Sequence, residues 1–309
     1  MFSVTVKAYA KLNIALNVLG VSDGFHMLDT VCTTVNKFDE VIAKKRNDCK
    51  ILISFTGRYG FIPPLQEETN AYKATKAFIG EFKTTGANIE IVRNIPTGSG
   101  MGGSSADIVG VLKALKKLYG VKSSIEPLAT KLGSDTTYLL KGGFARLTGR
   151  GENVEPFKCP KKLYFVVIYS SNAVTAKECF SKFDALNESG EVCDINSLKT
   201  LLENGEIEAL SNSLINKNPN ALTKSATLLN SEIQENLNSL KALSPYYFGM
   251  TGSGSTVFAL YENLEMAKWA YSKLSKRYGN SVEILSSHDP KNLSLFDVIF
   301  SKDYYEQEF

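Results

Sequence analysis

The segment 96–107, Pro-Thr-Gly-Ser-Gly-Met-Gly-Gly-Ser-Ser-Ala-Asp, has the composition of a loop that binds phosphate. Glycines let the backbone approach an anion closely, and the N–H groups that open a helix present a partial positive charge to it. A tight turn without a ligand is the alternative. A phosphate site is favoured because four glycines stand directly before a stretch with helical spacing, namely Gly98, Gly100, Gly102 and Gly103.

Two common phosphate-binding motifs fit this segment poorly. A Walker A loop requires a lysine after its last glycine, where this chain has Ser104. A dinucleotide fingerprint requires a second strand with an acid about 20 residues further on, but residues 125–132 have helical spacing. An oxidoreductase that uses NAD(P) is therefore the weaker interpretation. We expect Ser104 and Ser105 to cap the helix and to touch phosphate or its magnesium, because no nucleophile motif surrounds them.

A carboxylate and an ammonium group are candidates for phosphoryl transfer, which needs charge stabilisation and a group that receives the hydroxyl proton. Asp135 follows a Gly-Ser pair that allows a tight turn, and from the residues alone a helix N-cap explains it equally well. Lys11 stands between apolar residues of a predicted strand, where a solvent-facing lysine is the alternative. Asn13, two residues on, is predicted to share its face.

His26 is one of only two histidines and follows the turn residues Asp23 and Gly24 beside Phe25. A lone histidine is commonly a structural or surface residue, and that alternative stays open. Phe180 has helical spacing, so it fits either a helix core or a ligand contact.

Hydrophobic periodicity predicts the elements that position these residues. Apolar residues alternate over 2–18, as in a strand, and shorter strands are predicted at 30–35, 40–43, 51–55, 87–95, 163–169 and 256–261. Helices are predicted at 70–82, from Ser104 to before Gly120, and at 125–132, 175–186, 195–203, 207–214, 225–243 and 264–278. This order indicates an α+β fold. The composition changes around 156–162, so we expect two domains, 1–158 and 159–309; the last residues, 284–309, match no motif.

Composition excludes several classes of protein. The chain has 309 residues, 43% hydrophobic and 22% charged, and a net charge of +3, which fits a folded protein that does not bind nucleic acid. Its five cysteines form no Cys-x-x-Cys pair, so we expect no disulfide framework, no zinc site and a cytoplasmic location. The longest apolar stretch, 163–169, is too short to span a membrane. We expect a small-molecule substrate and a monomer or weak homodimer.

The segment 96–107 resembles the Pro-x-x-x-Gly-Leu-Gly-Ser-Ser-Ala signature of the galactokinase, homoserine kinase, mevalonate kinase and phosphomevalonate kinase (GHMP) superfamily. Further motifs occur in the order and spacing of its 4-diphosphocytidyl-2-C-methyl-D-erythritol kinase branch, in the non-mevalonate isoprenoid pathway. These motifs are Ala10–Asn13, Asp23–His26, Gly133–Asp135, Thr148–Glu152 and Met250–Phe258. The chain departs from the branch at Tyr9, Phe25, Met101, Ser104, Thr136 and Thr137.

The resemblance implies a two-domain GHMP kinase fold, with an N-terminal mixed-sheet nucleotide domain and a C-terminal ferredoxin-like α/β sandwich. It implies an enzyme that uses ATP and Mg²⁺ to phosphorylate the 2-hydroxyl of 4-diphosphocytidyl-2-C-methyl-D-erythritol, and it assigns no magnesium ligand. Asp135 and Lys11 would be catalytic. ATP would contact Pro96, Gly98, Gly100, Gly102, Gly103, Ser104, Ser105 and Asn70. The substrate would contact Asn13, Phe25, His26, Thr175, Phe180, Gly252 and Ser253, with the cytosine read by Phe25, His26 and Phe180.

Three alternatives remain open. Another GHMP kinase would act on homoserine, mevalonate or a sugar, and a substrate screen separates it. A non-catalytic metabolite-binding relative would bind ATP without turnover, although the presence of Asp135 and Lys11 argues against it. The third, an oxidoreductase, would require NAD(P) binding.

Overall fold

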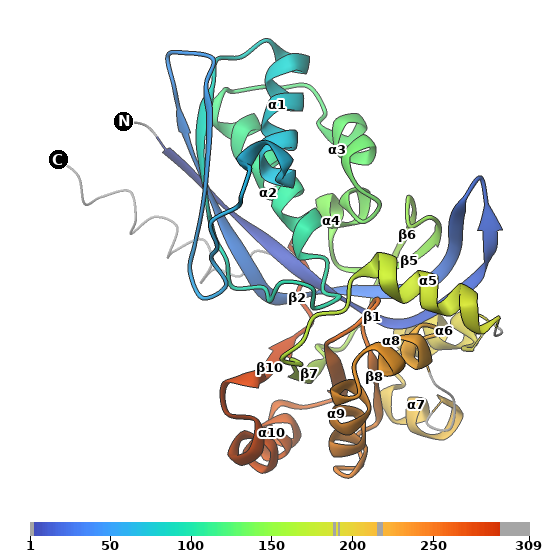
Figure 1. The fold of residues 1–309 in the computed structure, drawn as a ribbon. Coiled ribbons are helices and arrows are strands. Elements are labelled where there is room, and N and C mark those ends of the chain that lie inside the picture. Colours follow the sequence, from blue (N-terminus) through green and yellow to red (C-terminus); the bar gives the residue numbers. More distant parts are fainter. Residues whose placement is uncertain (1–2, 188–189, 191, 215–218, 291–309) are drawn as a thin grey trace.

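The structure, a computed structural model, describes residues 3–187, 190, 192–214 and 219–290 (Figure 1). Its first half is built on a long antiparallel hairpin of β1 (Ser3–Ser22) and β2 (Phe25–Lys45). The remaining strands of this sheet are β3 (Ile51–Thr56), β4 (Ala87–Val92), β5 (Phe144–Gly149) and β6 (Asn153–Phe157). The order is β3-β4-β2-β5-β6 with β1 against β2, and only β3 and β4 pair in parallel, so the sheet is mixed as predicted.

Helices cover one face of this sheet, as Figure 1 shows. They are α1 (Asn70–Phe82), preceded by the short η1 (Gln66–Glu68), α2 (Gly103–Leu118), α3 (Glu126–Leu132) and α4 (Thr136–Lys141). α2 contacts both β1 and β2. It buries Ala106 and Val111 on its sheet side, together with Gly110, whose missing side chain leaves room for Val41. α2 is therefore held rigidly, and the loop before it is held with it.

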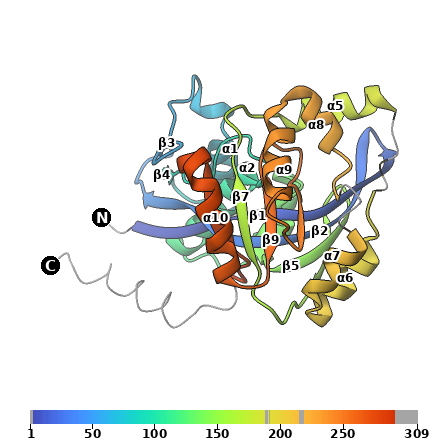
Figure 2. The same cartoon turned by 90° about the horizontal axis from the view of Figure 1, so that it is seen from below.

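The second half contains an antiparallel sheet of order β10-β7-β9-β8. Its strands are β7 (Tyr164–Ile168), β8 (Tyr247–Met250), β9 (Val257–Tyr261) and β10 (Val282–Ser286). Its helices are α5 (Ala176–Leu186), α6 (Ile195–Asn204), α7 (Ile207–Leu214), α8 (Thr223–Leu229), α9 (Glu232–Lys241), α10 (Leu264–Tyr278) and the short η2 (Gly279–Ser281). Figure 2 shows α9 and α10 lying over this sheet, which agrees with their contacts to its strands.

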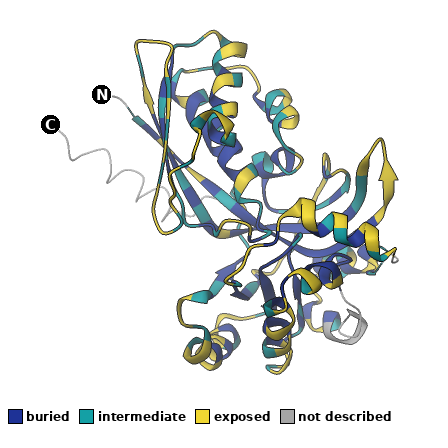
Figure 3. Cartoon of the chain, in the orientation of Figure 1, coloured by how far each residue is buried: buried dark blue, intermediate teal, exposed yellow. Residues whose placement is uncertain are grey.

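One of the two hydrophobic clusters spans both halves of the molecule. Leu12 of β1 and Phe165 of β7 belong to the same buried cluster, and the Tyr247 hydroxyl donates to the Ile14 carbonyl oxygen at 2.9 Å. Figure 3 shows that the buried residues follow the sheets and the inner side of α2, while the outer helix faces are exposed. The expected division at 158/159 falls in the connection between β6 and β7.

Some predicted element boundaries were wrong. The strands expected at 30–35 and 40–43 are parts of the single strand β2. The helix expected at 225–243 is split into α8 and α9 by Asn230, which adopts an extended conformation and whose side-chain amide donates to the Asn172 carbonyl oxygen at 2.9 Å. The short strands β8 and β10 were not predicted, and β10 occupies part of the segment that matched no motif. Residues 291–309 of that segment lie outside the described residues.

Two expectations from composition can be compared with the structure. Within the described residues, no disulfide joins the five cysteines. No helix in the described part of the chain has the length and apolar character needed to cross a membrane.

Candidate active site

A cavity of about 620 Å³ opens where the two halves of the molecule meet. Its walls include parts of β1 and β2, the loop before α2, the start of α4, the turn between β5 and β6, α5 and the loop after β8. Every residue that was expected to contact ATP or substrate lines it, with the exception of Asn70. The fold therefore brings together motifs that lie far apart in the sequence.

The glycine-rich loop at 98–103 packs directly on the second glycine loop at 252–254. Gly100 has a φ of +74°, and a Cβ at this position would lie 2.3 Å from the Thr251 carbonyl oxygen. The Thr256 N–H donates to the Ser99 carbonyl oxygen at 3.2 Å. Because backbone touches backbone here, only glycine fits at position 100. The two loops form one rigid wall of the cavity.

α2 begins beside this wall with Gly102 as its N-cap, and no side chain makes a capping hydrogen bond. The expectation that Ser104 and Ser105 cap the helix was therefore wrong: both lie within its first turn, two and three residues after the N-cap position. The Ser104 hydroxyl instead accepts a hydrogen bond of 2.7 Å from the side-chain amide of Asn70. Asn70 thus reaches the site indirectly, by orienting a serine that lines the cavity. The first residues of α2 line the cavity, so the positive end of its backbone dipole lies at the cavity wall.

Lys11 and Asp135 form an ion pair in the wall of the cavity. The Lys11 ammonium nitrogen lies 3.6 Å from Asp135 Oδ2 and also donates to the side-chain oxygen of Asn13, so the predicted shared face of Lys11 and Asn13 is confirmed. The Lys11 side chain is buried, whereas 31% of the Asp135 side chain is exposed. Asp135 occupies the N-cap position of α4 but makes no capping hydrogen bond. A structural role as a helix cap therefore does not explain this aspartate.

Two residues of β2 hold the side chain of Asn13 in place. Its side-chain amide donates to the Thr30 hydroxyl at 2.9 Å and lies 3.1 Å from the Cys32 sulfur. Burial raises the pKa of the Cys32 thiol to about 11, a shift that the nearby Lys11 ammonium only partly opposes. The thiol is therefore protonated at neutral pH and is a packing residue rather than a nucleophile.

Aromatic rings gather at the other end of the cavity. The His26 ring stacks on Phe180 with 4.5 Å between ring centroids, and its Nε2 lies 2.7 Å from Asp184 Oδ1. Phe25 is 48% exposed, and the Arg150 guanidinium lies 3.7 Å from its ring centroid. The structure thus brings Phe25, His26 and Phe180 together, and the ring that stacks on Phe180 is His26.

Thr175 begins the helix that carries Phe180. It is the N-cap of α5, where its hydroxyl accepts from the Glu178 N–H at 3.2 Å and the Glu178 carboxylate bonds back to Thr175. This reciprocal pair is a capping box, which fixes where the helix starts. The hydroxyl of Thr175 is therefore engaged in positioning α5.

Sequence reasoning missed a buried charged cluster that holds both ends of the glycine-rich loop. The Asp39 carboxylate accepts the N–H groups of Asn94 and Ile95 at 2.6 and 2.7 Å, directly before the loop. Arg93 forms an ion pair with Asp107, directly after it. Burial raises the pKa of Asp107 to about 7, a shift that the Arg93 charge opposes and the nearby Asp39 increases. The only sign of this cluster in the sequence is that Asp39 and Asp107 stand in otherwise apolar segments.

The described residues contain no group of three or more His, Cys, Asp and Glu side chains arranged to hold a metal ion. The hydroxyl groups of Ser104 and Ser105 are the oxygen donors beside the start of α2. Magnesium in phosphoryl-transfer sites is commonly held by one or two protein oxygens together with substrate phosphates and water. This donor set therefore fits an ion that enters with a nucleotide better than a resident ion.

Family models and curated relatives agree with each other. The model of the GHMP kinases N-terminal domain matches residues 69–143, and that of the GHMP kinases C-terminal domain matches residues 198–280. A 4-diphosphocytidyl-2-C-methyl-D-erythritol kinase of Clostridium perfringens is 34% identical over 278 residues, covering 88% of this chain and 94% of that protein. A protein of the same name from Cutibacterium acnes is 33% identical, covering 86% and 88%.

The comparison with solved structures agrees with these relatives. The crystal structure of a 4-(cytidine 5'-diphospho)-2C-methyl-D-erythritol kinase superposes with a TM-score of 0.73 at 25% identity, covering 92% of this chain and 99% of the other. The mevalonate kinase of Methanococcus jannaschii superposes with a TM-score of 0.67 at 16% identity, covering 93% and 98%. At that identity the second likeness concerns the fold alone.

Proposed function

Because the chain belongs to the GHMP kinases, and within them to the family of 4-diphosphocytidyl-2-C-methyl-D-erythritol kinases, we propose that it transfers the γ-phosphoryl group of ATP to the 2-hydroxyl of 4-diphosphocytidyl-2-C-methyl-D-erythritol. The observation that carries this proposal is the pair of Lys11 and Asp135. It lies in the one cavity that also holds the glycine-rich loop and the aromatic cluster.

Asp135 is the proposed catalytic base. Its partly exposed carboxylate receives the proton of the acceptor hydroxyl as that oxygen bonds to the γ-phosphorus, and the bond from this phosphorus to the β,γ-bridging oxygen breaks to release ADP. Lys11 lies beside the carboxylate, where its positive charge stabilises the negative charge that develops on the acceptor oxygen. Asn13 orients the Lys11 ammonium through their hydrogen bond.

The glycine-rich wall is the proposed site for the ATP phosphates. Gly98, Gly100, Gly102 and Gly103 allow close approach of the backbone, with Pro96 at the entrance of the loop and the N-terminus of α2 at its end. Ser104 and Ser105 would hold a magnesium ion together with the phosphates, and Asn70 orients Ser104. The ion, when bound, neutralises charge on the β- and γ-phosphates.

The aromatic end of the cavity is the proposed site for cytosine. Phe25 and Phe180 offer ring faces for stacking, and the His26 ring offers Nδ1, the nitrogen that Asp184 does not hold, for a hydrogen bond to the base. Asn13, Thr175, Gly252 and Ser253 line the same cavity and are the proposed contacts for the rest of the substrate. His26 is held by Asp184, so its orientation is fixed before the base binds.

The test is a substrate screen. The protein is incubated with ATP, magnesium and, one at a time, 4-diphosphocytidyl-2-C-methyl-D-erythritol, methylerythritol phosphate without the cytidine, mevalonate, homoserine and galactose, and ADP release is measured. We expect turnover with the cytidine compound alone, and none in the Asp135→Asn variant. Equal turnover with an acceptor that lacks cytidine would contradict the proposed substrate, whereas ATP binding without turnover of any acceptor would contradict the kinase activity.

A further inference from the structure

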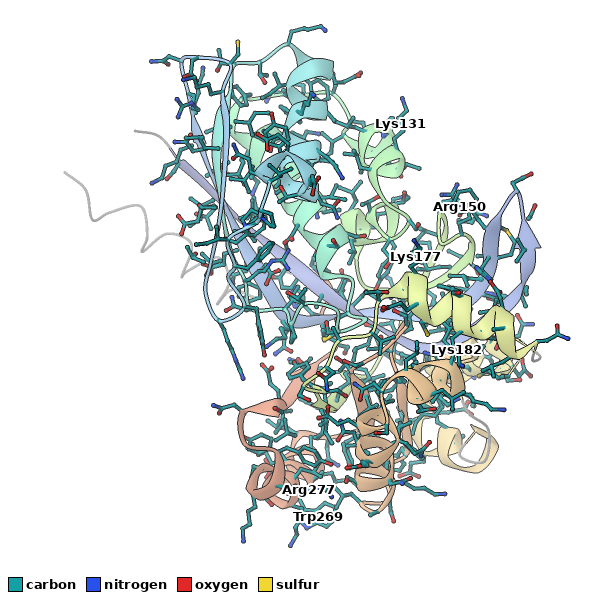
Figure 4. All side chains as sticks on the ribbon, viewed as in Figure 1. Lys131, Arg150, Lys177, Lys182, Trp269 and Arg277 are labelled. Carbon is teal, nitrogen blue, oxygen red and sulfur yellow. The ribbon has the colours of Figure 1, made fainter. Side chains whose placement is uncertain are left out.

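Asn220 is a buried polar residue that the proposed reaction does not use directly. Its exposed fraction is 0%, whereas polar side chains such as Lys131, Lys177 and Arg277, labelled in Figure 4, are exposed at the surface. Burying an amide is unfavourable unless its donors and its acceptor find partners inside the protein. The partners of Asn220 therefore indicate what it holds in place.

The backbone around Asn220 lies on the strand that carries Lys11. The Leu16 N–H of β1 donates to the Pro219 carbonyl oxygen at 2.8 Å, and the Ala221 N–H donates to the Leu16 carbonyl oxygen at 2.9 Å. These two bonds enclose Asn220 and form a parallel bridge between Leu16 and Asn220. The position of Asn220 relative to β1 is therefore fixed by main-chain contacts on both sides.

The Asn220 side chain joins this segment to the loop after β8. Its amide nitrogen donates to the carbonyl oxygens of Met250 and Gly252, both at 2.8 Å, and its oxygen accepts the Leu222 N–H at 2.9 Å. An amide supplies two donors and an acceptor in this way, whereas an ionised carboxylate has no donor and a hydroxyl has only one. The loop is therefore held at two points, one on each side of Thr251.

The loop after β8 contacts two parts of the proposed catalytic machinery. The Thr251 hydroxyl accepts the backbone N–H of Asn13 at 2.8 Å, and the Asn13 side chain in turn holds the Lys11 ammonium. On its other side the loop packs on the glycine-rich loop so closely that a Cβ at Gly252 would lie 2.7 Å from the Gly100 carbonyl oxygen. Displacing the loop after β8 would therefore disturb both the Lys11 region and the glycine-rich loop.

We propose that Asn220 is a positioning residue for phosphoryl transfer, which holds the loop after β8 where the Lys11 region and the glycine-rich loop require it. The inference rests on the proposed function, which assigns those two parts of the site to the acceptor oxygen and to the ATP phosphates. Asn220 does not line the cavity, so it acts through the loop and not through contact with a ligand. The aromatic end of the cavity is carried by β2 and α5, so recognition of cytosine should not depend on Asn220.

The test removes the donors of Asn220 while it keeps the size of the side chain. In Asn220→Asp the Leu222 N–H keeps its acceptor, but an ionised carboxylate places an oxygen against the carbonyl oxygens of Met250 and Gly252. Asn220→Ser, which keeps one donor, is a milder second variant. Thermal melting shows at which temperatures each variant is folded, and all assays are run below the lowest of these transitions.

Asn17→Asp is the matched control. Asn17 is buried, its amide nitrogen donates to the Cys193 carbonyl oxygen at 2.7 Å, and its oxygen accepts the N–H groups of Val192 and Cys193, both at 3.0 Å. The control therefore undergoes the same chemical change, but Asn17 does not line the cavity and holds a different segment of the chain. The quantities measured are kcat with the cytidine acceptor and the dissociation constants for ATP and for cytidine.

We expect Asn220→Asp to lower kcat about 10- to 100-fold, the scale for displacing a reacting group by about 1 Å, and to weaken ATP binding. Cytidine binding should change by less than about twofold. Asn220→Ser should lose less than Asn220→Asp, and Asn17→Asp should keep the kcat of the wild type. Thr251→Val removes the hydroxyl that accepts the Asn13 N–H, so combining it with Asn220→Asp should lower kcat by less than the product of the two single losses.

A parallel loss of ATP and cytidine affinity in Asn220→Asp would show general damage to the fold and would overturn the inference. An equal loss of kcat in Asn17→Asp, or single losses that multiply in the double variant, would overturn it as well. A wild type that turns over no cytidine-containing acceptor would instead contradict the proposed function. The ATP affinities of Asn220→Asp and Asn17→Asp would then still decide whether Asn220 positions the glycine-rich loop.

Discussion

The ammonium group of Lys11 lies 3.6 Å from the carboxylate of Asp135, yet Lys11 is buried in β1 and Asp135 is partly open to the cavity. The Lys11 ammonium is thus shielded from water, while the Asp135 carboxylate can be reached by a substrate. A short distance between opposite charges in a partly dry site strengthens their interaction relative to bulk water. Asp135 can therefore receive a proton from a substrate while it stays beside Lys11.

Asp135→Asn should lower kcat by roughly 10²–10⁴, the usual scale for losing a general base. The dissociation constant for ATP should change little, and stability should be retained because the Asp135 side chain makes no capping hydrogen bond. Single-turnover kinetics and ATP titration measure the two quantities. Loss of folding with unchanged activity per folded molecule would show that the residue is structural.

Lys11→Ala should also reduce kcat more than it weakens ATP binding, because the lost charge acts on the acceptor oxygen. Lys7→Ala is the matched control, since Lys7 lies on the same strand but is exposed and contacts the ring of Phe38. The control should keep full activity. Steady-state kinetics on both variants separate the two cases, and an equal loss in both would contradict a catalytic role for Lys11.

His26→Ala should raise the KM for the cytidine substrate about 10- to 100-fold, because unpaired polar groups on a bound base cost about 1–3 kcal/mol. Part of the loss arises from the stacking of His26 on Phe180, which the variant removes. The KM for ATP serves as an internal reference and should stay nearly constant. A parallel rise in both KM values would argue against a cytosine site at this end of the cavity.

Gly100→Ala should strongly weaken ATP binding, because the new Cβ would lie 2.3 Å from the Thr251 carbonyl oxygen and force the two glycine loops apart. Gly120→Ala is a matched control: its φ of +66° carries the same backbone strain, but nothing lies within 4 Å of the added Cβ. We expect the control to lose some stability and to keep its ATP affinity. Fluorescence titration with ATP compares them, and equal affinities would show that loop packing does not shape the phosphate site.

The buried pair of Asp39 and Asp107 should make stability depend on pH. Burial raises the pKa of both carboxyls, and that of Asp107 to about 7. Between about pH 4 and pH 7 the folded protein holds a proton that the unfolded chain has released, so this contribution to the free energy of unfolding decreases as the pH rises and levels off above 7.

Urea unfolding of the wild type and of Asp107→Asn, measured from pH 5 to pH 8, tests this dependence. Asparagine cannot ionise, so the variant should show a shallower decline between pH 5 and pH 7 than the wild type. Identical slopes in the two proteins would mean that Asp107 is ionised throughout this range. Arg93→Lys would then show whether the ion pair alone accounts for stability at this junction.

The local features of this protein were predictable from its sequence. The glycine-rich loop before α2, the helices α1, α5, α6 and α10 and the long strand near the N-terminus all follow from periodicity and backbone preferences, which act over a few residues. The shared face of Lys11 and Asn13 follows from strand alternation. These features concern residues that are neighbours along the chain.

The tertiary structure decided between alternatives that the sequence left open. Residues 10–18 of β1 are all buried, because the helices of the first half cover one side and the second half packs on the other, as the Leu16 N–H bond of 2.8 Å to the Pro219 carbonyl oxygen shows. Lys11 is therefore buried rather than solvent-facing. Likewise, the split at Asn230 depends on its bond to Asn172, a partner that is distant in sequence.

The sequence by itself determined a glycine-rich loop directly before a helix and the residue types around it, because glycine conformations, helical periodicity and strand alternation are set by local backbone physics. Only the tertiary structure placed Asp135 beside Lys11, His26 on Phe180 and Arg150 over Phe25. These contacts join separate elements, and their geometry depends on how the two sheets pack against each other. No local preference carries that information, since many packings satisfy the same periodicity.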